Sequence, residues 1–186
     1  MIDMHSVGSL LGCLLGSLYV FLDYVHSLSY GNVCLTHSLV NQILNLVSPE
    51  LVGVGDKIVL VNAAGDSAMG AQNDKKRDVV AITVADNVAS LTADVVIITL
   101  EAGSQEGTFA LKVADGYLAY ANNGNAISTQ ETVDDAASWT ITITDGVVSI
   151  QNVAYAERFL QYNISAPRFV CYKGTQEAPV IYKVEE

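Results

Sequence analysis

The sequence has few basic residues, and it has no histidine after residue 37. Nine lysines and arginines stand against twenty acidic residues, which gives a formal net charge of −11. Affinity for nucleic acid comes mainly from Lys and Arg contacts to phosphates, so this charge argues against a nucleic-acid partner. Because His5, His26 and His37 all precede residue 50, the rest of the chain lacks Ser-His and Cys-His nucleophile pairs, a His general base and His-ligated metals.

Basic residues cluster at one place only, the run Lys75-Lys76-Arg77. Asp74 and Asp78 flank this run on either side. Alternating charges of this kind are typical of a hydrated surface, so we predict a solvated loop rather than an anion site.

Cysteines are few and odd in number: Cys13, Cys34 and Cys171. Only Cys171 lies in the later part of the chain, so no disulfide framework is available there. It stands between Val170 and Tyr172 on a predicted strand, where a buried, inert thiol is the usual role of a free cysteine. No motif implies a metal or another cofactor.

The first fifty-two residues differ in composition from the rest and are predicted to form a hydrophobic, helical segment. Residues 7–28 are long enough to span a membrane, but Asp23 and His26 lie within them. No Lys or Arg precedes Lys57, so the positive region of a secretory signal is missing. Residues 39–47 have the pattern of a short amphipathic helix.

Three interpretations of residues 1–52 are open. They form a membrane anchor, a helical hairpin packed on the following domain, or sequence translated from a truncated or miscalled gene. Membrane contact follows only if residues 1–30 are an anchor. The box Leu10-Leu11-Gly12-Cys13 is like that of a bacterial lipoprotein, but too few residues precede it. The third interpretation is favoured, because no repeat unit extends into this segment.

From residue 53 to residue 186 the sequence consists of short alternating apolar runs separated by Gly, Asn and Asp, which is typical of strands and tight turns. The runs form three copies of a four-strand unit. The predicted first strands are 58–62, 109–113 and 148–152. The second strands are 68–71, 117–120 and 159–162. The third strands are 79–84, 126–130 and 168–172. The fourth strands are 93–97, 137–141 and 178–182.

Threefold repetition of four strands predicts an all-β domain with the β-trefoil fold, a closed six-strand barrel capped by three hairpins. A β-sandwich has no reason to repeat three times, and a three-bladed propeller falls below the usual number of blades. The prediction requires Leu60, Leu111 and Ile150 to occupy matching places in one core. Residues 86–92 make the first repeat longer, and we expect them to extend the turn between its third and fourth strands.

The second and third repeats also resemble a known family. The segments Gly116-Tyr117-Leu118-Ala119-Tyr120 and Arg158-Phe159-Leu160-Gln161-Tyr162-Asn163 are similar to a trefoil-like domain at the C-terminal end of secreted multidomain proteins from Bacteroides-type gut bacteria. The resemblance covers residues 55–184. It implies an exported accessory module, extracellular or at the cell surface, of the kind attached to hydrolase or adhesin domains.

Aromatic, amide and acidic side chains cluster around the second-strand hairpins of repeats two and three. Neutral sugars are bound by oriented donors and acceptors beside one flat apolar surface. The predicted ligand-binding residues are Asp115, Tyr117, Tyr120, Asn122, Asn123, Tyr162, Asn163 and Arg168. The asparagines also suit tight turns, and repeat one has Ala68 and Ala71 at the matching positions.

Other candidates have structural interpretations that are favoured. Trp139 aligns with Val95 and Val180, which predicts a core residue. Arg158 and Arg168 could bind an acidic sugar, but surface ion pairs with Glu157 or Glu177 are expected. The pair Asp134-Asp135 lacks the spaced ligands of a calcium loop and is expected in a solvated turn.

Three functions remain open at this point. The favoured hypothesis is a noncatalytic carbohydrate-binding or adhesive accessory module. The alternative is a protein-binding, inhibitor-like or spacer trefoil that contacts a partner through loops near Lys75 and Ser165. An enzyme is the least favoured, since only unmatched carboxylates such as Asp115 and Glu131 suggest glycosidase chemistry.

Overall fold

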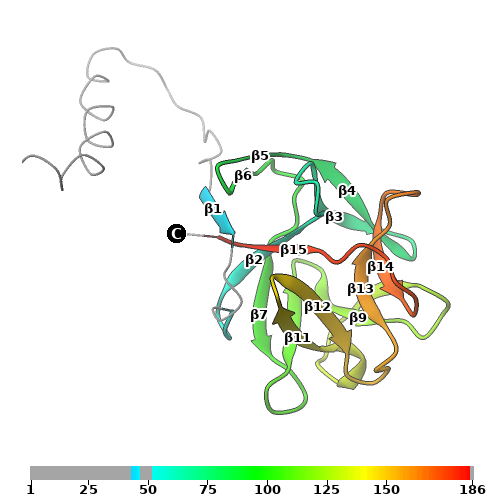
Figure 1. The fold of residues 1–186 in the computed structure, drawn as a ribbon. Coiled ribbons are helices and arrows are strands. Elements are labelled where there is room, and N and C mark those ends of the chain that lie inside the picture. The colour runs from blue at the N-terminus through cyan, green and yellow to red at the C-terminus, as the bar shows by residue number, and fades with distance from the viewer. Residues whose placement is uncertain (1–42, 47–51, 185–186) are drawn as a thin grey trace, which may run out of the picture. The chain divides into compact units, whose positions relative to one another are not determined.

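The computed structural model describes residues 43–46 and 52–184. These residues belong to one compact unit that spans Leu39–Glu186. Apart from one short 3-10 helix, Asp135–Ala137, the described elements are β-strands (Figure 1). No helix among them is long and apolar enough to cross a membrane.

Six strands form a barrel, and each repeat contributes two of them. They are β2 (Lys57–Val61), β7 (Ile98–Ala102), β8 (Phe109–Val113), β11 (Ser138–Thr144), β12 (Val147–Asn152) and β15 (Val180–Val184). Antiparallel pairing runs from β15 through β2, β7, β8 and β11 to β12. Strand β12 also lies against β15, which closes the ring. Closure leaves none of these strands as an open sheet edge.

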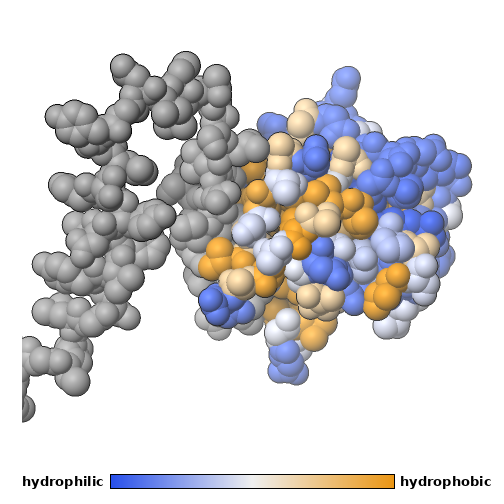
Figure 2. Space-filling view, turned by 90° about the horizontal axis from the view of Figure 1, so that it is seen from above, coloured by the Kyte–Doolittle hydropathy of each residue, from blue (hydrophilic) through white to orange (hydrophobic). Residues whose placement is uncertain are grey.

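Three hairpins cap one end of the barrel. They pair β3 (Ser67–Asn73) with β4 (Lys76–Ala81), β9 (Gly116–Tyr120) with β10 (Ile127–Gln130), and β13 (Phe159–Tyr162) with β14 (Phe169–Tyr172). The hairpins also bond to one another: the Ile127 amide donates to the Lys75 carbonyl at 3.0 Å, and the Cys171 amide donates to the Asn125 carbonyl at 3.0 Å. Their tips lie on the side where hydrophilic residues gather (Figure 2).

The threefold core confirms the β-trefoil prediction. Leu60, Leu111 and Ile150 are at most 1% exposed and belong to one cluster of buried side chains. The barrel register relates them: Leu60 lies opposite Ile181, Leu111 opposite Leu100, and Ile150 opposite Ile141.

The predicted fourth strand of the first repeat is wrong. Residues 93–97 are irregular, and the strand begins at Ile98. Ile98 pairs with Ile58 in the first repeat just as Trp139 pairs with Phe109 in the second. The residue of the first repeat that matches Trp139 is therefore Ile98 and not Val95. An alternating Ala-x-Val-x-Ile pattern suits any chain segment that packs one face on a sheet, so the pattern alone did not place the barrel strand.

The extra residues of the first repeat form an added hairpin between its third and fourth strands, as expected. It pairs β5 (Thr83–Ala85) with β6 (Val88–Ser90) through a turn in which Asp86 and Asn87 have φ of 52° and 63°. A second apolar cluster lies here, formed by Val59, Val61, Ala68, Ala89, Val95, Tyr182 and Val184. The insertion therefore covers the outer face of β2 and β15, and both faces of β2 are buried.

Strand β1 (Ile43–Leu46) corrects the helix predicted over residues 39–47. It pairs with β15 on one side and with β6 on the other (Figure 1). Strand β1 pairs with residues 182–184 at the end of β15 and with the side of β6 that faces away from β5, and such tertiary pairing overrides a local helical pattern. The remaining predictions for residues 1–52, including the anchor, lie outside the described residues.

Candidate ligand-binding site

One cross-strand pair recurs near the tip of each cap hairpin. The pairs are Gln72–Arg77, Tyr120–Ile127 and Tyr162–Phe169. In the second and third repeats a tyrosine packs beside a large apolar residue, and all four side chains are at most 5% exposed. In the first repeat both members are polar, although Arg77 is only 1% exposed.

Arg77 is therefore buried, and the prediction of a solvated loop is wrong for this residue. It lies on β4, where alternation turns its neighbours Lys76 and Asp78 outward to pair with each other at 2.6 Å. The carboxylate nearest to Arg77 is Asp115, with 3.4 Å between Nη2 and Oδ1. Burial lowers the pKa of Arg77, and the nearby Asp115 opposes that shift.

Two buried polar atoms of the Gln72–Arg77 pair have no hydrogen-bond partner among the described residues: Arg77 Nε and Gln72 Oε1. The Gln72 amide nitrogen donates to the carbonyls of Asp74 at 2.8 Å and Ile127 at 2.9 Å. These bonds fix the amide and leave its oxygen unpaired. An unpartnered buried donor or acceptor costs about 1–3 kcal/mol, so the pair destabilises the fold as it stands.

Both side chains line a cleft of about 950 Å³ between the β3–β4 hairpin, residues 93–97 and the turn after β8. We call it the Arg77 cleft. Its polar side chains are Gln72, Arg77, Asp78, Asp94 and Asp115. Its apolar side chains are mainly Val79, Val80, Val95, Val96, Ile97 and Val113. A partly apolar hollow with a few convergent polar groups is typical of small-ligand sites.

Asp115 is held at the rim of this cleft by its turn. The next residue, Gly116, has φ of +127°, and a Cβ there would lie 2.6 Å from the Gln130 carbonyl oxygen. Only glycine fits this close approach. Thr129 Oγ1 donates to Asp115 Oδ2 at 3.3 Å, while Oδ1 faces Arg77. The carboxylate side chain is 51% exposed and so remains open to a ligand.

The three predicted tyrosines lie apart from the cleft. Tyr117 donates its hydroxyl to Glu101 Oε2 at 2.8 Å, beside Lys112. Tyr120 is buried and donates to the Gly124 carbonyl at 3.0 Å. Tyr162 is buried against Phe169, with 5.2 Å between ring centroids. Neither buried ring offers a face to solvent, because these tyrosines fill the core under the hairpins.

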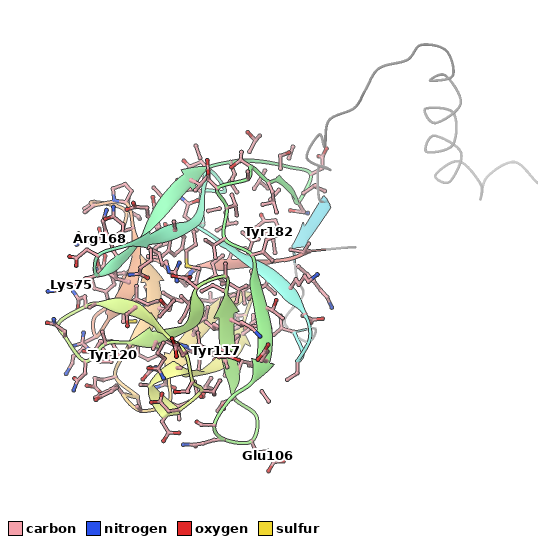
Figure 3. The ribbon with its side chains drawn as sticks, turned by 180° about the vertical axis from the view of Figure 1, so that it is seen from behind. Lys75, Glu106, Tyr117, Tyr120, Arg168 and Tyr182 are labelled. Carbon is pink, nitrogen blue, oxygen red and sulfur yellow. The ribbon has the colours of Figure 1, made fainter. Side chains whose placement is uncertain are left out.

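The predicted amides and Arg168 lie around the hairpin tips. Asn122, with φ of 48°, belongs to the β9–β10 turn, and Asn163 accepts from the Ala166 amide in its own turn at 2.9 Å. Asn123 and Arg168 line a second hollow of about 410 Å³ between the tips. Figure 3 shows Lys75, Tyr120 and Arg168 on the same side of the molecule.

The sequence analysis grouped Asp115 with the tyrosines of repeats two and three, whereas the structure places Asp115 at the Arg77 cleft beside Gln72 and Arg77, which the sequence analysis did not select. Alignment of the three hairpins by their cross-strand pairs contains the missing signal. A polar pair where two repeats have Tyr–Ile and Tyr–Phe breaks the apolar pattern.

Within the part of the chain that the structure describes, neither Arg158 nor Arg168 forms the expected ion pair with Glu157 or Glu177. Lys173 pairs with Glu157 at 3.0 Å, and Glu177 accepts from the Ala63 amide at 2.8 Å. Arg158 donates to Asn125 Oδ1 at 2.9 Å, and Arg168 Nε donates to the Tyr172 hydroxyl at 3.4 Å. The folded chain brings Lys173 and the Ala63 amide to the two carboxylates, and sequence proximity could not reveal this.

Three other candidates have structural roles. Trp139 is fully buried and donates to the Leu118 carbonyl at 2.9 Å, which confirms a core residue. Cys171 is also buried, and burial raises the pKa of its thiol to about 12. Asp134 caps the 3-10 helix by accepting from the amides of Ala136 and Ala137.

Comparison with known proteins supports the fold. No family model and no curated protein matches the chain. Among solved structures, SeviL bound to asialo-GM1 saccharide has a TM-score of 0.51 and 16% identity, covering 70% of this chain and 97% of that one. The BEL β-trefoil has a TM-score of 0.52 and 14% identity, covering 78% and 100%.

A third similar structure is the Polyporus squamosus lectin bound to the epitope Neu5Acα2-6Galβ1-4GlcNAc. It has a TM-score of 0.52 and 15% identity, and the match covers 71% of this chain but only 49% of the lectin. Similarity at these identities establishes the β-trefoil fold and leaves function to the chemistry of the site.

Proposed function

We propose that residues 53–186 form a noncatalytic carbohydrate-binding module and that the Arg77 cleft binds a neutral saccharide. One observation carries the proposal. Of the three matching cross-strand pairs in the described hairpins, Gln72–Arg77 is the polar one, and its Arg77 Nε and Gln72 Oε1 are buried without partners beside the exposed Asp115. A ligand that supplies both a donor and an acceptor would satisfy them.

A sugar hydroxyl has this dual character, because it donates one hydrogen bond and accepts others. One hydroxyl would accept from Arg77 Nε and donate to Gln72 Oε1, and a neighbouring hydroxyl would donate to Asp115. The valines of the cleft offer a surface for the apolar C–H face of the ring.

The charges of the cleft favour a neutral ligand over an anion. Arg77 is the only cation among the described residues that line the cleft, and it faces Asp115. Asp94 also lines the cleft, while Asp78 is paired with Lys76. An added negative charge would meet more acidic than basic groups here.

Two similar structures contain bound saccharides, SeviL and the Polyporus squamosus lectin. They support carbohydrate binding as a use of this fold. We further propose that the module is an accessory part of an exported protein, at the cell surface or outside the cell. That part of the proposal rests on the resemblance of its second and third repeats to secreted proteins.

The test is a glycan array followed by calorimetric titration, with Galβ1-4GlcNAc as the first neutral probe. Asp115→Asn should weaken binding of the best array ligand at least tenfold, because the charged acceptor for a sugar hydroxyl is replaced by a neutral amide oxygen. Asp145→Asn is the matched control, since it removes one acidic charge from an exposed turn where asparagine tolerates the φ of 51°.

A flat response across neutral glycans would overturn the proposal, as would equal binding by Asp115→Asn and Asp145→Asn. Recovery of a cleaved saccharide after incubation would contradict the noncatalytic assignment.

A further inference from the structure

The tips of the three cap hairpins enclose a second hollow, which we call the hairpin pocket. It has a volume of about 410 Å³ and is lined by residues from all three repeats. The side chains that matter here are Asn73, Asp74, Lys75, Asn123, Asn125 and Arg168. It shares no lining residue with the Arg77 cleft.

Two cations of this pocket are not neutralised. Lys75 and Arg168 form no ion pair with a carboxylate in the part of the chain that the structure describes, whereas Lys76 pairs with Asp78 at 2.6 Å. Among the described residues of the lining, Asp74 is the one that is acidic. On a chain with a net charge of −11, this pocket is a local excess of positive charge.

Amide groups add directional donors to the pocket. Asn125 Oδ1 accepts from Arg158 Nη1 at 2.9 Å, so the oxygen is already used and the Asn125 NH₂ group is left for a ligand. Arg158, which is not among the described lining residues, adds a further positive charge beside Asn125. The Arg168 guanidinium uses Nε for the Tyr172 hydroxyl at 3.4 Å, which leaves its terminal nitrogens for other acceptors.

We propose that the hairpin pocket binds the carboxylate of an acidic saccharide. A guanidinium offers paired donors that fit a planar carboxylate, and a lysine adds a mobile charge. The amides of Asn123 and Asn125 can bind the neighbouring hydroxyls. The anion chemistry stands on the pocket alone, and the saccharide character of the ligand rests on the function proposed above.

The experiment is an NMR titration of the full chain with three probes: the methyl α-glycoside of N-acetylneuraminic acid, methyl β-galactoside and sodium sulfate. The acidic glycoside should shift the backbone amides of residues 74–76, 123–126 and 168. The double variant Lys75→Gln/Arg168→Gln should lower its affinity at least tenfold. Lys173→Gln is the control for loss of a surface cation outside the pocket, because Lys173 is exposed and pairs with Glu157.

Binding should weaken as the ionic strength rises from about 0.05 M to about 0.5 M, because partly exposed charges are screened. Sulfate should compete with the acidic glycoside, since both present oxyanion oxygens. Arg77→Met should leave the acidic glycoside bound while methyl β-galactoside is lost, which separates this pocket from the Arg77 cleft.

Three results would overturn the proposal. The first is that the acidic glycoside does not shift the pocket amides. The second is that Lys173→Gln weakens binding of the acidic glycoside as much as the double variant does. The third is that sulfate binds while the acidic glycoside does not. The third result would show that the pocket binds simple anions and would exclude an acidic saccharide as its ligand. If methyl β-galactoside fails to bind while the acidic glycoside binds, the result contradicts the proposed saccharide site in the Arg77 cleft and leaves the hairpin-pocket proposal standing.

Discussion

Replacement of Arg77 by methionine should make the domain more stable while it abolishes binding in the Arg77 cleft. Methionine keeps most of the volume of the arginine stem and removes the buried charge. It also restores the apolar character that Ile127 and Phe169 have at the matching positions. Replacing a buried charge by an apolar side chain of similar volume is often neutral or stabilising.

The magnitude follows from the contacts of Arg77. The unpartnered Nε costs about 1–3 kcal/mol, and the substitution removes that cost. The pair with Asp115 is long, at 3.4 Å, and its carboxylate is 51% exposed, so its loss costs only about 0.2–1 kcal/mol. The net gain in free energy of unfolding is about 1–2 kcal/mol, which raises Tm by roughly 3–6 °C for a domain of this size.

Urea and thermal unfolding, measured with a titration of the best neutral glycan, check both effects in one variant. Ile127→Met is the matched control, because it changes the same position in the second repeat from one apolar residue to another. It should cost less than about 1.5 kcal/mol and leave binding in the Arg77 cleft intact. A loss of stability above about 1 kcal/mol in Arg77→Met would refute the reasoning, because it would show Arg77 to be a satisfied structural cation.

The remaining predictions concern the core and one turn. Trp139→Phe should lower the free energy of unfolding by about 1–3 kcal/mol in urea titrations, since it leaves the Leu118 carbonyl without its 2.9 Å bond; an unchanged midpoint would contradict this. Burial raises the pKa of Cys171 from 9.0 to about 12, so the unfolded chain loses its thiol proton first and stability should fall as pH rises between these values. Cys171→Ala should flatten that slope, and an equally steep slope would exclude the thiol as its cause. Gly116→Ala should destabilise the domain by about 1 kcal/mol or more, since its Cβ would meet the Gln130 carbonyl at 2.6 Å; a wild-type Tm would show that the turn relaxes.

The threefold core was predictable from sequence because strand alternation is local. Leu60, Leu111 and Ile150 each stand in a short run whose alternate residues are apolar, and the runs repeat along the chain. Strand β7 was misplaced because residues 93–97 alternate in the same way while they pack on the second apolar cluster. Strand β1 was missed because its partners, β6 and β15, lie far away in sequence.

The site was less predictable than the fold. Arg77 stands in a basic run flanked by acidic residues, and such a run suggests a hydrated loop. Only the pairing of β3 with β4 turns Arg77 inward and sets it opposite Gln72. The tyrosines show the opposite case, in which residues predicted at the surface are buried. Their hydroxyls suggest contact with a ligand, but Tyr120 and Tyr162 fill the core beneath the hairpins.

The most direct test follows the Nε–H signal of Arg77 in a ¹H–¹⁵N spectrum during titration with the best neutral glycan. Comparison with Arg77→Met assigns the signal. If Arg77 Nε donates to a sugar hydroxyl, the signal shifts along the binding isotherm and saturates with it. A glycan that binds while the Nε–H signal stays fixed would contradict the assignment of the Arg77 cleft as the saccharide site.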